Sequence, residues 1–405
     1  MTDKTILSGW EINLPTINDF NELINKLTAN ECVQENKWFN DEDLVTELEL
    51  YGNPSVVTYH NKPHALDFFL KELIDKSLKK AKLDKTKLQG RRVRFYLAGH
   101  GMRTDLNNYQ GFYNKNDVED INYSPTIKKL HAKYYAQDHL ANELLRYYGL
   151  TWPPISIYGT SNSALMATHI GNKAINNGEL DVVVVISWLD IYLQDILFID
   201  GQDMLVQEYA QPFSLASDGA ILSEGYAVLI LESESHLNKR EFHPRVYLNY
   251  SGCMQSHGER NSNVSFYTIS KVIENTMETL NLNESELGAV FAHGNGSIIS
   301  DKAEAMAIEN LLKNNLDIPV LSYKGQIGYI SNCSGIIDLM IMTEAIINKR
   351  ILPSVSHYPI ISNLKFNFFS DTEPLPYLKK CMLKLGLGMD GSIITMVLSS
   401  YQELN

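Results

Sequence analysis

Residues 155–186, ISIYGTSNSALMATHIGNKAINNGELDVVVVI, form the most orderly stretch of the sequence. It opens with a short strand pattern, turns tightly at 159–163 and continues as a helix over 164–177. Gly178 ends that helix, since glycine adopts the backbone conformation found beyond a helix C-terminus without strain. The apolar run at 181–186 then predicts a strand that is buried on both faces. Strand, turn, helix and parallel strand form a βαβ unit, which places the chain in the α/β class.

The second half of the chain echoes this order of elements. A strand pattern at 289–292 runs into His293-Gly-Asn-Gly296. The later elements are a helix over 301–314, a strand at 318–322, a loop at 324–333, a helix over 334–348 and a strand at 392–399. No residue-by-residue repeat is visible, and no flexible Gly/Ser linker separates the halves. We therefore predict one compact unit with a duplicated α/β fold, whose halves are residues 1–235 and 236–405.

Composition limits the class of protein. The chain has 405 residues, of which 44% are hydrophobic, so it can bury a large core and global disorder is excluded. Its 35 basic and 48 acidic side chains give a net charge of −13, which disfavours binding to nucleic acid or to an anionic membrane surface. No apolar run approaches the ~20 residues that span a bilayer, and the N-terminus lacks the pattern of a signal peptide. We expect a cytoplasmic protein.

The four cysteines, Cys32, Cys253, Cys333 and Cys381, lie far apart and form no CxxC pair. This spacing predicts neither a zinc site nor a disulfide framework. The stretch at 386–391 has the spacing GxGxxG, but a strand rather than a helix follows it, so it does not predict a nucleotide site. A close-packed turn before the last strand is the better interpretation. We therefore expect no metal and no cofactor.

Ser161 lies between the end of a predicted strand and the start of a predicted helix. Such a turn exposes a side chain beside the free N–H groups of the helix N-terminus, which suits a nucleophile and an oxyanion hole. Serine is also a common residue at the N-cap of a helix. The local sequence leaves both interpretations open.

Two further segments carry groups that could take part in chemistry. His293 stands at a strand end beside a glycine, where it is either a general base or a structural histidine in a turn. Lys324-Gly-Gln-Ile-Gly-Tyr329 offers a cation and a phenol beside glycines that permit close packing. A loop that is merely well packed is the alternative for this second segment.

Taken together and in this order, these motifs resemble those of the β-ketoacyl synthases of the thiolase superfamily. The turn at Ser161 resembles the nucleophile elbow of that family. The other matches are 211–232 to the stretch before the second half, 292–304 to the HGTGT motif and its acidic helix, 324–329 to the KSNxGH loop, and 386–389 to the GFGG turn. The resemblance spans about residues 5–400. It implies a duplicated thiolase-like fold, layered α-β-α-β-α with mixed five-stranded sheets.

The chain departs from the family at the groups that do the chemistry. The family condenses acyl chains with a cysteine, which carries the acyl group as a thioester, and two histidines. The matching positions here are Ser161, His293 and Tyr329, with Lys324 opening the KSNxGH-like loop and Leu387 replacing the phenylalanine of the GFGG turn. A serine hydroxyl is a much weaker nucleophile than a thiolate. A phenol of pKa ~10 cannot replace a neutral imidazole as proton acceptor.

The resemblance therefore implies a ketosynthase β subunit, or chain length factor, of a type II polyketide or aryl polyene system. Such a subunit is catalytically silent, forms a heterodimer with a ketosynthase α subunit, works with an acyl carrier protein and lines the tunnel for the chain. Residues expected at that tunnel or at the dimer interface are Tyr109, Phe112, Tyr134, Tyr135 and Leu387, with ordinary core packing as the alternative. A second hypothesis is a Ser-dependent acyltransferase with Ser161 as nucleophile and His293 as base. A non-enzymatic assembly protein is the third.

A cluster of lysines and arginines at 79–92 stands out against the acidic balance of the chain. An acyl carrier protein is normally acidic, so docking on this chain would need a local basic patch. The cluster fits a solvated helix face better, and we expect carrier docking mainly on the partner subunit.

Overall fold

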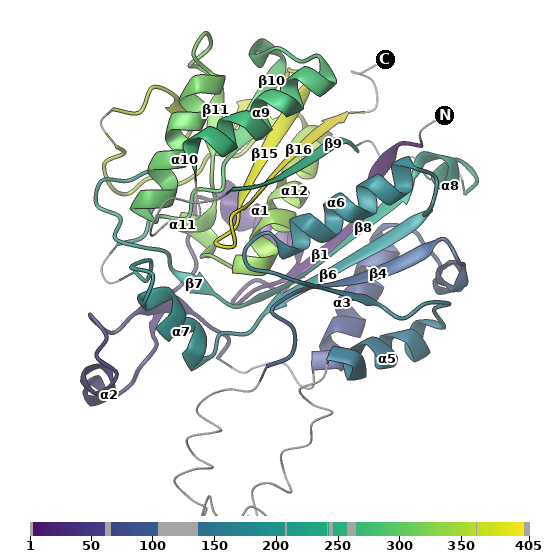
Figure 1. The fold of residues 1–405 in the computed structure, drawn as a ribbon, viewed down its shortest axis with the longest axis horizontal. Coiled ribbons are helices and arrows are strands. Elements are labelled where there is room, and N and C mark those ends of the chain that lie inside the picture. The colour runs from purple at the N-terminus through teal and green to yellow at the C-terminus, as the bar shows by residue number, and fades with distance from the viewer. Residues whose placement is uncertain are drawn as a thin grey trace, which may run out of the picture.

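The computed structural model describes residues 3–60, 66–103, 137–206, 209–240, 242, 246–256, 265–361 and 363–400. The predicted βαβ unit is present: β5 (Ile155–Tyr158) leads into α6 (Ser163–Asn176), which is followed by β6 (Val182–Leu189). Both strands pair in parallel with β4 (Val93–Gly99), which lies between them in the sheet. The crossover from β5 to β6 therefore skips one strand (Figure 1).

Two groups of five strands repeat one pairing pattern. In the first group, β6 pairs antiparallel with β8 (Gly225–Ser233), which pairs antiparallel with β1 (Thr5–Asn13). The second group repeats these two antiparallel and two parallel pairings through β9 (Val246–Gln255), β16 (Ser392–Ser400), β15 (Cys381–Leu387), β10 (Leu287–Phe291) and β11 (Pro319–Leu321). The repetition confirms the predicted duplicated fold with mixed sheets. The division between 1–235 and 236–405 stays a prediction.

The two groups are joined edge to edge, which the sequence did not indicate. β1 pairs with β9 at only two positions, Thr5 with Leu248 and Ile6 with Tyr247. Within the described residues the strands thus form one eleven-stranded sheet, with β13 (Asn367–Phe368) at one edge and β5 at the other. Because the junction is so short, the groups diverge beyond it and face each other across two helices (Figure 1).

Helices form three layers around these strands. α6 and α12 (Ser331–Asn348) pack against each other and contact strands of both groups. α3 (Leu66–Lys80) and α5 (Gln137–Tyr148) cover the outer face of the first group. α9 (Phe266–Leu280) and α10 (Ile298–Leu311) cover the outer face of the second group. Figure 1 shows the resulting α-β-α-β-α layers that a thiolase-like fold requires.

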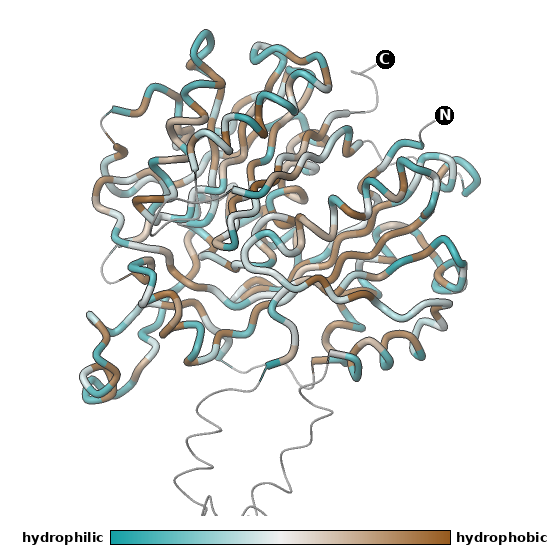
Figure 2. Tube along the Cα trace, viewed as in Figure 1, coloured by the Kyte–Doolittle hydropathy of each residue, from teal (hydrophilic) through white to brown (hydrophobic). Residues whose placement is uncertain are grey.

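The position of β6 between two helical layers explains its continuously apolar sequence. Val184 packs with α3 and α5 in one core cluster, whereas its neighbours Val183 and Val185 pack with α6 and α12 in another. All eight residues of the strand are buried, because successive side chains point to opposite faces and both faces are covered. Figure 2 shows hydrophobic residues along the central strands and hydrophilic ones on the outer helices and loops.

α12 is buried over fourteen of its eighteen residues, since both groups of strands surround it. Gly335 of this helix and Gly386 of β15 lie directly against the side chain of Leu165 in α6. A Cβ atom at either glycine would overlap that side chain. The two glycines therefore let α12 and β15 approach closely around the start of α6, where the predicted nucleophile turn lies.

The observed boundaries differ from the predicted ones in the second half. α10 begins at Ile298 rather than at 301, and α12 begins at Ser331 rather than at 334. The loop before α12 contains a short helix, α11 (Lys324–Ile327). The stretch at 386–391 forms the hairpin turn between β15 and β16, where the N–H of Gly388 donates to the carbonyl of Ser392 at 2.8 Å. This confirms the predicted turn.

The remaining elements are short. They are α1 (Phe20–Thr28), β2 (Asn36–Lys37), α2 (Glu42–Glu47), β3 (Ser55–Val57), the 3-10 helix Lys85–Gln89, α7 (Leu193–Asp200), β7 (Leu222–Ser223), α8 (Glu234–Asn238), the 3-10 helix Glu284–Glu286, β12 (Arg350–Ile351) and β14 (Leu375–Pro376). β3 pairs with β2 and β7 in a small separate sheet. Within the described part of the chain, no helix combines the length and the apolarity that crossing a membrane demands.

Candidate functional site

Ser161 lies in the turn between β5 and α6, and its side chain is buried. Asn162 occupies the N-cap position of α6, so the alternative interpretation of Ser161 as the helix cap is wrong. The Ser161 hydroxyl instead forms a hydrogen bond with the hydroxyl of Tyr329. Asn162 Nδ2 donates to the carbonyl of Ser392 at 2.9 Å, which ties the turn to the β15–β16 hairpin.

Tyr329 follows α11 and is fixed at its backbone and at its side chain. Its backbone N–H and carbonyl both bond to the segment 221–223. Its hydroxyl also bonds to the side chains of Asn295 and Ser331. Burial raises the pKa of Tyr329 to about 12, although these hydrogen bonds act in the opposite direction. At neutral pH the group beside Ser161 is therefore an un-ionised phenol, which is a poor proton acceptor.

His293 stands just beyond β10 and is buried. Its ring meets the Tyr329 ring edge-on, with ring centroids 5.7 Å apart and ring planes at 88°. Burial lowers the pKa of His293 well below its ordinary value, and the nearby ammonium groups of Lys324 and Lys384 lower it further. The imidazole is therefore neutral at physiological pH. The structure thus brings Ser161, Tyr329 and His293 together, with the phenol in the middle.

Two carboxylates of α10 hold the backbone of the loop that carries His293. Glu304 accepts hydrogen bonds from the N–H groups of His293 and Gly294 at 2.6 and 2.7 Å. Asp301 accepts from the next two N–H groups, of residues 295–296, at 3.1 and 3.2 Å. Burial raises the pKa of Asp301 to about 7, and burial also raises the pKa of Glu304. The shape of the loop is therefore fixed through its backbone, independently of the imidazole.

Asp301 also reaches the segment before β7. The N–H of Phe213 donates to Asp301 at 2.8 Å. Phe213 has a φ of 55°, in the left-handed region that bulky residues rarely adopt. Its ring lies where a Cβ atom on Gly294 would project, so a glycine is required at that position. Asp301 of α10 therefore holds two loops by hydrogen bonds, the one that carries Phe213 and the one that carries His293.

A buried ionic cluster lies next to His293. Lys384 Nζ donates to the carbonyl of Ala292 at 2.9 Å and lies 2.5 Å from Asp338 Oδ2. Lys324 Nζ lies 3.4 Å from the same carboxylate oxygen, and all three side chains are buried. Burial lowers the pKa of Lys384 to about 8. Sequence reasoning found Lys324 but missed Lys384, whose signal is a lysine in the middle of the apolar strand CMLKLGL.

The residues predicted for a tunnel or a dimer interface fall in two groups. Tyr109, Phe112, Tyr134 and Tyr135 lie outside the described residues. Leu387 ends β15 and is buried in the core cluster that includes α9 and α10. Met389, two residues further on, lines a cavity beside the Ser161 turn. The predicted role of Tyr109, Phe112, Tyr134, Tyr135 and Leu387 in a tunnel or a dimer interface stays a prediction.

That cavity has a volume of about 350 Å³. It is lined by Thr160, the residue before Ser161, and by Ser331, which bonds to Tyr329. Other lining residues come from α7 and from the segment that follows β4. Sequence reasoning missed these residues, because the glycine turn at 99–101 was the only signal for them. The cavity therefore begins beside the Ser161–Tyr329 pair and continues toward α7 and the segment that follows β4.

Comparison with known proteins shows the family. The model of the β-ketoacyl synthase N-terminal domain matches residues 65–236, and the model of the C-terminal domain matches residues 249–358. The probable polyketide synthase 17 of Dictyostelium discoideum is 26% identical over 317 residues, covering 72% of this chain and 12% of that protein. The putative polyketide beta-ketoacyl synthase 1 of Streptomyces cyaneus is 22% identical over 251 residues, covering 59% of this chain and 58% of that protein. The chain thus spans less than two thirds of either relative.

Solved structures share the fold. One is a chain from a type II PKS acyl-carrier protein in complex with its ketosynthase bound to the hexaketide, with a TM-score of 0.84, 17% identity, and coverage of 98% of this chain and 100% of that one. The ishigamide ketosynthase/chain length factor has a TM-score of 0.83, 14% identity, and coverage of 99% and 100%. The two domain models together cover more than two thirds of the chain. From its motifs and the matches to both domains, the chain belongs to the β-ketoacyl synthase family.

Proposed function

We propose that this chain is a ketosynthase β subunit, a chain length factor, which pairs with a ketosynthase α subunit and shapes the tunnel for a growing polyketide chain. The α subunit supplies the cysteine that holds the acyl group, and an acyl carrier protein delivers that group. The proposal is supported by the family membership and by a site that keeps its scaffold while its nucleophile is changed. One solved structure of the same fold is itself named a ketosynthase/chain length factor.

One observation carries the proposal: the Ser161 hydroxyl bonds to a buried phenol. A serine becomes a nucleophile only when a neighbouring group takes its proton. Tyr329 is a poor acceptor at neutral pH, because it is un-ionised and its pKa is about 12. Among the described residues, the Ser161 hydroxyl has no hydrogen bond with an imidazole. The hydroxyl is therefore held in an unreactive state.

The backbone bonds around His293 support a role in assembly. The carboxylates of Asp301 and Glu304 hold the loop through its backbone and need no reacting group to do so. A subunit that must match the shape of an active partner benefits from such a scaffold, whatever its own chemistry. We infer that the scaffold is kept for the interface and for the tunnel wall, to which Tyr109, Phe112, Tyr134 and Tyr135 are proposed to contribute.

Carrier docking is assigned to the partner subunit in this proposal. The basic cluster at 79–92 precedes β4, whereas the cavity is lined by residues that follow β4. β4 has seven residues, so its ends are about 20 Å apart. Some of the cations are also paired within the chain, as Lys85 is with Asp75 at 2.8 Å. The cluster is therefore poorly placed to present a carrier to the Ser161 turn.

A Ser-dependent acyltransferase is the second candidate, with Ser161 as nucleophile and His293 as base. The neutral state of the buried imidazole favours it, because a neutral imidazole can accept a proton. The candidate requires the Tyr329 hydroxyl to give up its bond with Ser161. Losing a partner of a buried hydroxyl costs about 1–3 kcal/mol.

An intact-mass measurement separates the two candidates. The purified chain is incubated with an octanoyl-carrier protein, and Ser161→Ala is the matched control. We expect no acyl adduct on either protein, since the described residues place no proton acceptor other than the un-ionised Tyr329 phenol against the wild-type hydroxyl. An adduct on the wild type that is missing from Ser161→Ala would establish the acyltransferase and contradict the proposal.

Co-purification tests the partnership itself. The tagged chain is expressed with a cognate ketosynthase that carries the cysteine and both histidines, and the mass of the complex is measured by light scattering. The proposal predicts a heterodimer with one copy of each subunit. A stable homodimer of this chain that ignores the ketosynthase would contradict it.

A further inference from the structure

The basic cluster at 79–92 is a strongly charged segment in an acidic chain. It contains seven lysines and arginines and one carboxylate, so its formal net charge is +6. Because the whole chain carries −13, the remaining residues carry −19. The segment spans the end of α3, the 3-10 helix Lys85–Gln89 and the turn before β4. We name the surface that it forms at the start of β4 the basic edge.

A segment of opposite charge lies at the other end of the molecule. Residues 31–53, which include α2, contain seven carboxylates and one lysine and have a formal net charge of −6. Figure 1, in which the longest axis is horizontal, shows α2 at the lower left and the start of β4 at the right. The net charge of the chain is therefore distributed unevenly. It does not describe the basic edge, because charges more than about 8 Å away are largely screened at physiological ionic strength.

Four exposed cations of the basic edge form no ion pair with another described residue. They are Lys79, Lys82, Lys87 and Arg91. By contrast, Arg92 is paired with Asp181 at 2.7 Å. The dipole of α3 favours a cation in its last turn, which accounts for Lys79 but not for Lys87 and Arg91, which lie beyond that helix. Cations gathered without partners repel one another, and an anionic partner would relieve this repulsion.

Two exposed aromatic side chains border the basic edge. Trp152 is 45% exposed, and its Nε1 donates to the carbonyl of Arg91 at 3.3 Å. The guanidinium carbon of Arg94 lies 5.0 Å from the centre of the Trp152 ring. Tyr147 is 48% exposed, and Lys85 Nζ lies 4.5 Å from the centre of its ring. Exposed tryptophan and tyrosine rings beside basic side chains are typical of surfaces that lie on lipid, because these rings are stable at the level of the headgroups.

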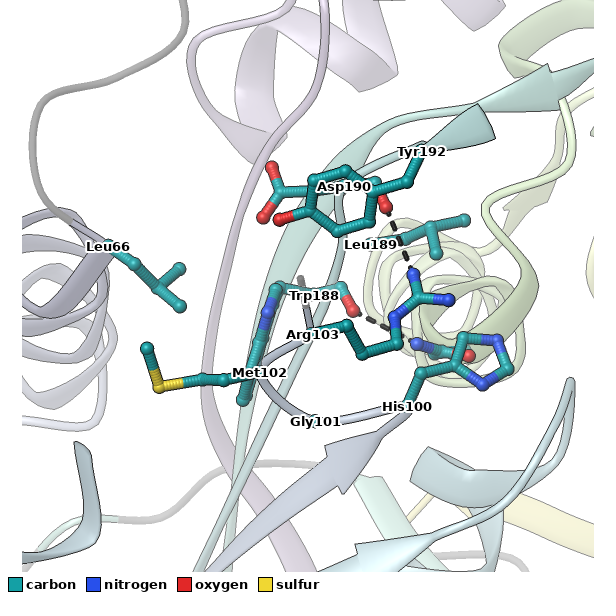
Figure 3. A pocket seen from close by; sticks show the side chains of 10 residues that line it. Leu66, His100, Gly101, Met102, Arg103, Trp188, Leu189, Asp190 and Tyr192 are labelled. Atoms are coloured by element: carbon teal, nitrogen blue, oxygen red, sulfur yellow. Dashed lines mark hydrogen bonds between the residues drawn. The ribbon is translucent and has the colours of Figure 1, made fainter. Parts of the chain in front are cut away.

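The cavities near the candidate site lie at the other end of β4. His100 and Arg103, which follow that strand, line both the cavity of about 350 Å³ and a smaller one of about 170 Å³ (Figure 3). Asp195 neutralises Arg103 there through two hydrogen bonds of 2.5 and 3.0 Å. The seven residues of β4 separate these cavities from the basic edge by about 20 Å. The basic edge is therefore a separate surface, whose cations are not neutralised in this way.

The kind of cation indicates the kind of partner. Three of the four unpaired cations are lysines, whose ammonium group is a point charge on a flexible stem. Recognition of single carboxylates or phosphates in a fixed geometry favours arginine, whereas a diffuse negative surface needs no fixed geometry. We infer that the basic edge binds peripherally to an anionic phospholipid membrane, with the four unpaired cations at the headgroups and Trp152 at the interface. This inference does not depend on the proposed function.

Sedimentation with lipid vesicles tests this inference. The protein is used as purified, including a ketosynthase subunit where the two co-purify. It is mixed with vesicles of phosphatidylcholine alone, or of phosphatidylcholine with about 30% phosphatidylglycerol, which supplies the negative surface. Each cation near such a surface raises the partition coefficient about fivefold. We therefore expect binding to the anionic vesicles to be about 100-fold stronger or more, and to weaken steeply as the salt concentration rises.

Two quadruple variants of equal net charge assign the binding to the basic edge. The first removes the four unpaired cations: Lys79→Gln, Lys82→Gln, Lys87→Gln and Arg91→Gln. We expect it to lower the partition coefficient on anionic vesicles by about 100-fold. The control removes four exposed lysines of the second half and should bind like the wild type: Lys271→Gln, Lys302→Gln, Lys313→Gln and Lys365→Gln. Trp152→Gln should weaken binding severalfold and leave its salt dependence unchanged, since the ring carries no charge.

Equal binding to the two kinds of vesicle would overturn the inference, and so would no binding to either. An equal loss in the two quadruple variants would show that net charge alone matters, which also contradicts a defined surface. If the vesicles do not bind, but an acyl carrier protein binds the wild type and not the first quadruple variant, the basic edge serves an acidic protein and the inference is wrong. None of these results bears on whether Ser161 reacts, so the proposed function is tested separately.

Discussion

The loop that carries His293 and the turn that carries Ser161 meet at Tyr329, but they are held in different ways. Four successive backbone N–H groups of the loop, from His293 to Gly296, bond to two buried carboxylates of one helix. The turn is held by side chains, through Asn162 to the β15–β16 hairpin and through the Ser161–Tyr329 bond. Two hydroxyls of the turn, on Thr160 and Ser163, have no partner among the described residues.

This difference means that the backbone structure of the site and the reactivity of its side chains depend on different bonds. The bonds that shape the loop do not involve the imidazole, so they persist whatever that side chain does. The reactivity of the turn depends on one pair of side chains, Ser161 and Tyr329. Exchanging a thiol for a hydroxyl and an imidazole for a phenol therefore changes reactivity and leaves the backbone in place. The silent subunit proposed here, which must match an active partner, needs this combination.

The largest expected effect comes from restoring reactive groups to the turn. In the double variant Ser161→Cys, Tyr329→His, a thiol stands beside an imidazole that can take its proton. We expect acyl transfer from octanoyl-pantetheine thioester to residue 161 to rise on the order of 100-fold or more, since a positioned base contributes at least that much. Intact mass against time measures the rate. Ser161→Ala with Tyr329→His is the control, and equal labelling of that control or of the wild type would contradict the account.

The next effect concerns the hydrogen bonds by which Glu304 holds the His293 loop. Glu304→Ala leaves the N–H groups of His293 and Gly294 without an acceptor, and it should lower the free energy of unfolding by about 3 kcal/mol. Urea unfolding followed by circular dichroism measures the loss. Glu309→Ala is the matched control on the same helix, because the Glu309 carboxylate accepts from the N–H of Lys365 at an exposed position. If the free energy of unfolding falls by the same amount in both variants, the Glu304 hydrogen bonds do not contribute the stability assigned to them.

A pH effect of intermediate size follows from the buried imidazole. The pKa of His293 is lowered in the folded state, whereas in the unfolded chain it returns to 6.5. The unfolded chain therefore binds a proton below 6.5 that the folded chain does not bind. The stability contribution of His293 is full above that pH and is lost as the pH falls, by about 1.4 kcal/mol per pH unit. His293→Gln should remove this contribution.

Urea unfolding of the wild type and of His293→Gln at about pH 7.5 and about pH 5.5 measures the difference in slope. Asp301 has a raised pKa of about 7 and contributes with the opposite sign, so only the comparison between the two proteins isolates His293. We expect the wild type to lose more stability on acidification than the variant. Parallel pH profiles would show that the imidazole is not the buried neutral group described here.

The smallest effect concerns the side-chain pair of the turn. A double-mutant cycle with Ser161→Ala and Tyr329→Phe should give a coupling free energy of about 1 kcal/mol, the value of one hydrogen bond between neutral groups. Urea unfolding of the four proteins provides it. A coupling free energy as large as the fall in the free energy of unfolding caused by Glu304→Ala would contradict the difference described between the loop and the turn. Additive losses in the two single variants would show that the hydrogen bond between Ser161 and Tyr329 does not form.

The fold could be predicted from the sequence where local patterns decide it. The apolar run of β6 and the helix pattern of α6 are sufficient for the βαβ unit, because periodicity and burial agree there. The strand β15 was not predicted, because Lys384 interrupts its apolar sequence. That lysine is tolerated only because Asp338 and the carbonyl of Ala292 satisfy it, and both partners are remote in sequence.

The positions of Ser161, His293 and Tyr329 could be proposed from ordered motifs, but their contacts could not. The bond between Ser161 and Tyr329 joins residues 168 positions apart, and only the packing of the two halves brings them together. The same holds for Arg103 and Asp195, which are 92 residues apart and lie in segments without a recognisable motif. Tertiary pairs of this kind leave no local pattern, so the sequence alone does not indicate them.

A condensation assay with malonyl-carrier and acyl-carrier substrates tests directly whether this chain is silent. The assay is run on this chain alone, on the cognate ketosynthase that we propose as its partner, and on the mixture. Product sizes are read by mass spectrometry. We expect no elongation by this chain alone and defined polyketide products from the mixture. Elongation of a carrier-bound acyl group by this chain alone at an enzymatic rate would contradict it.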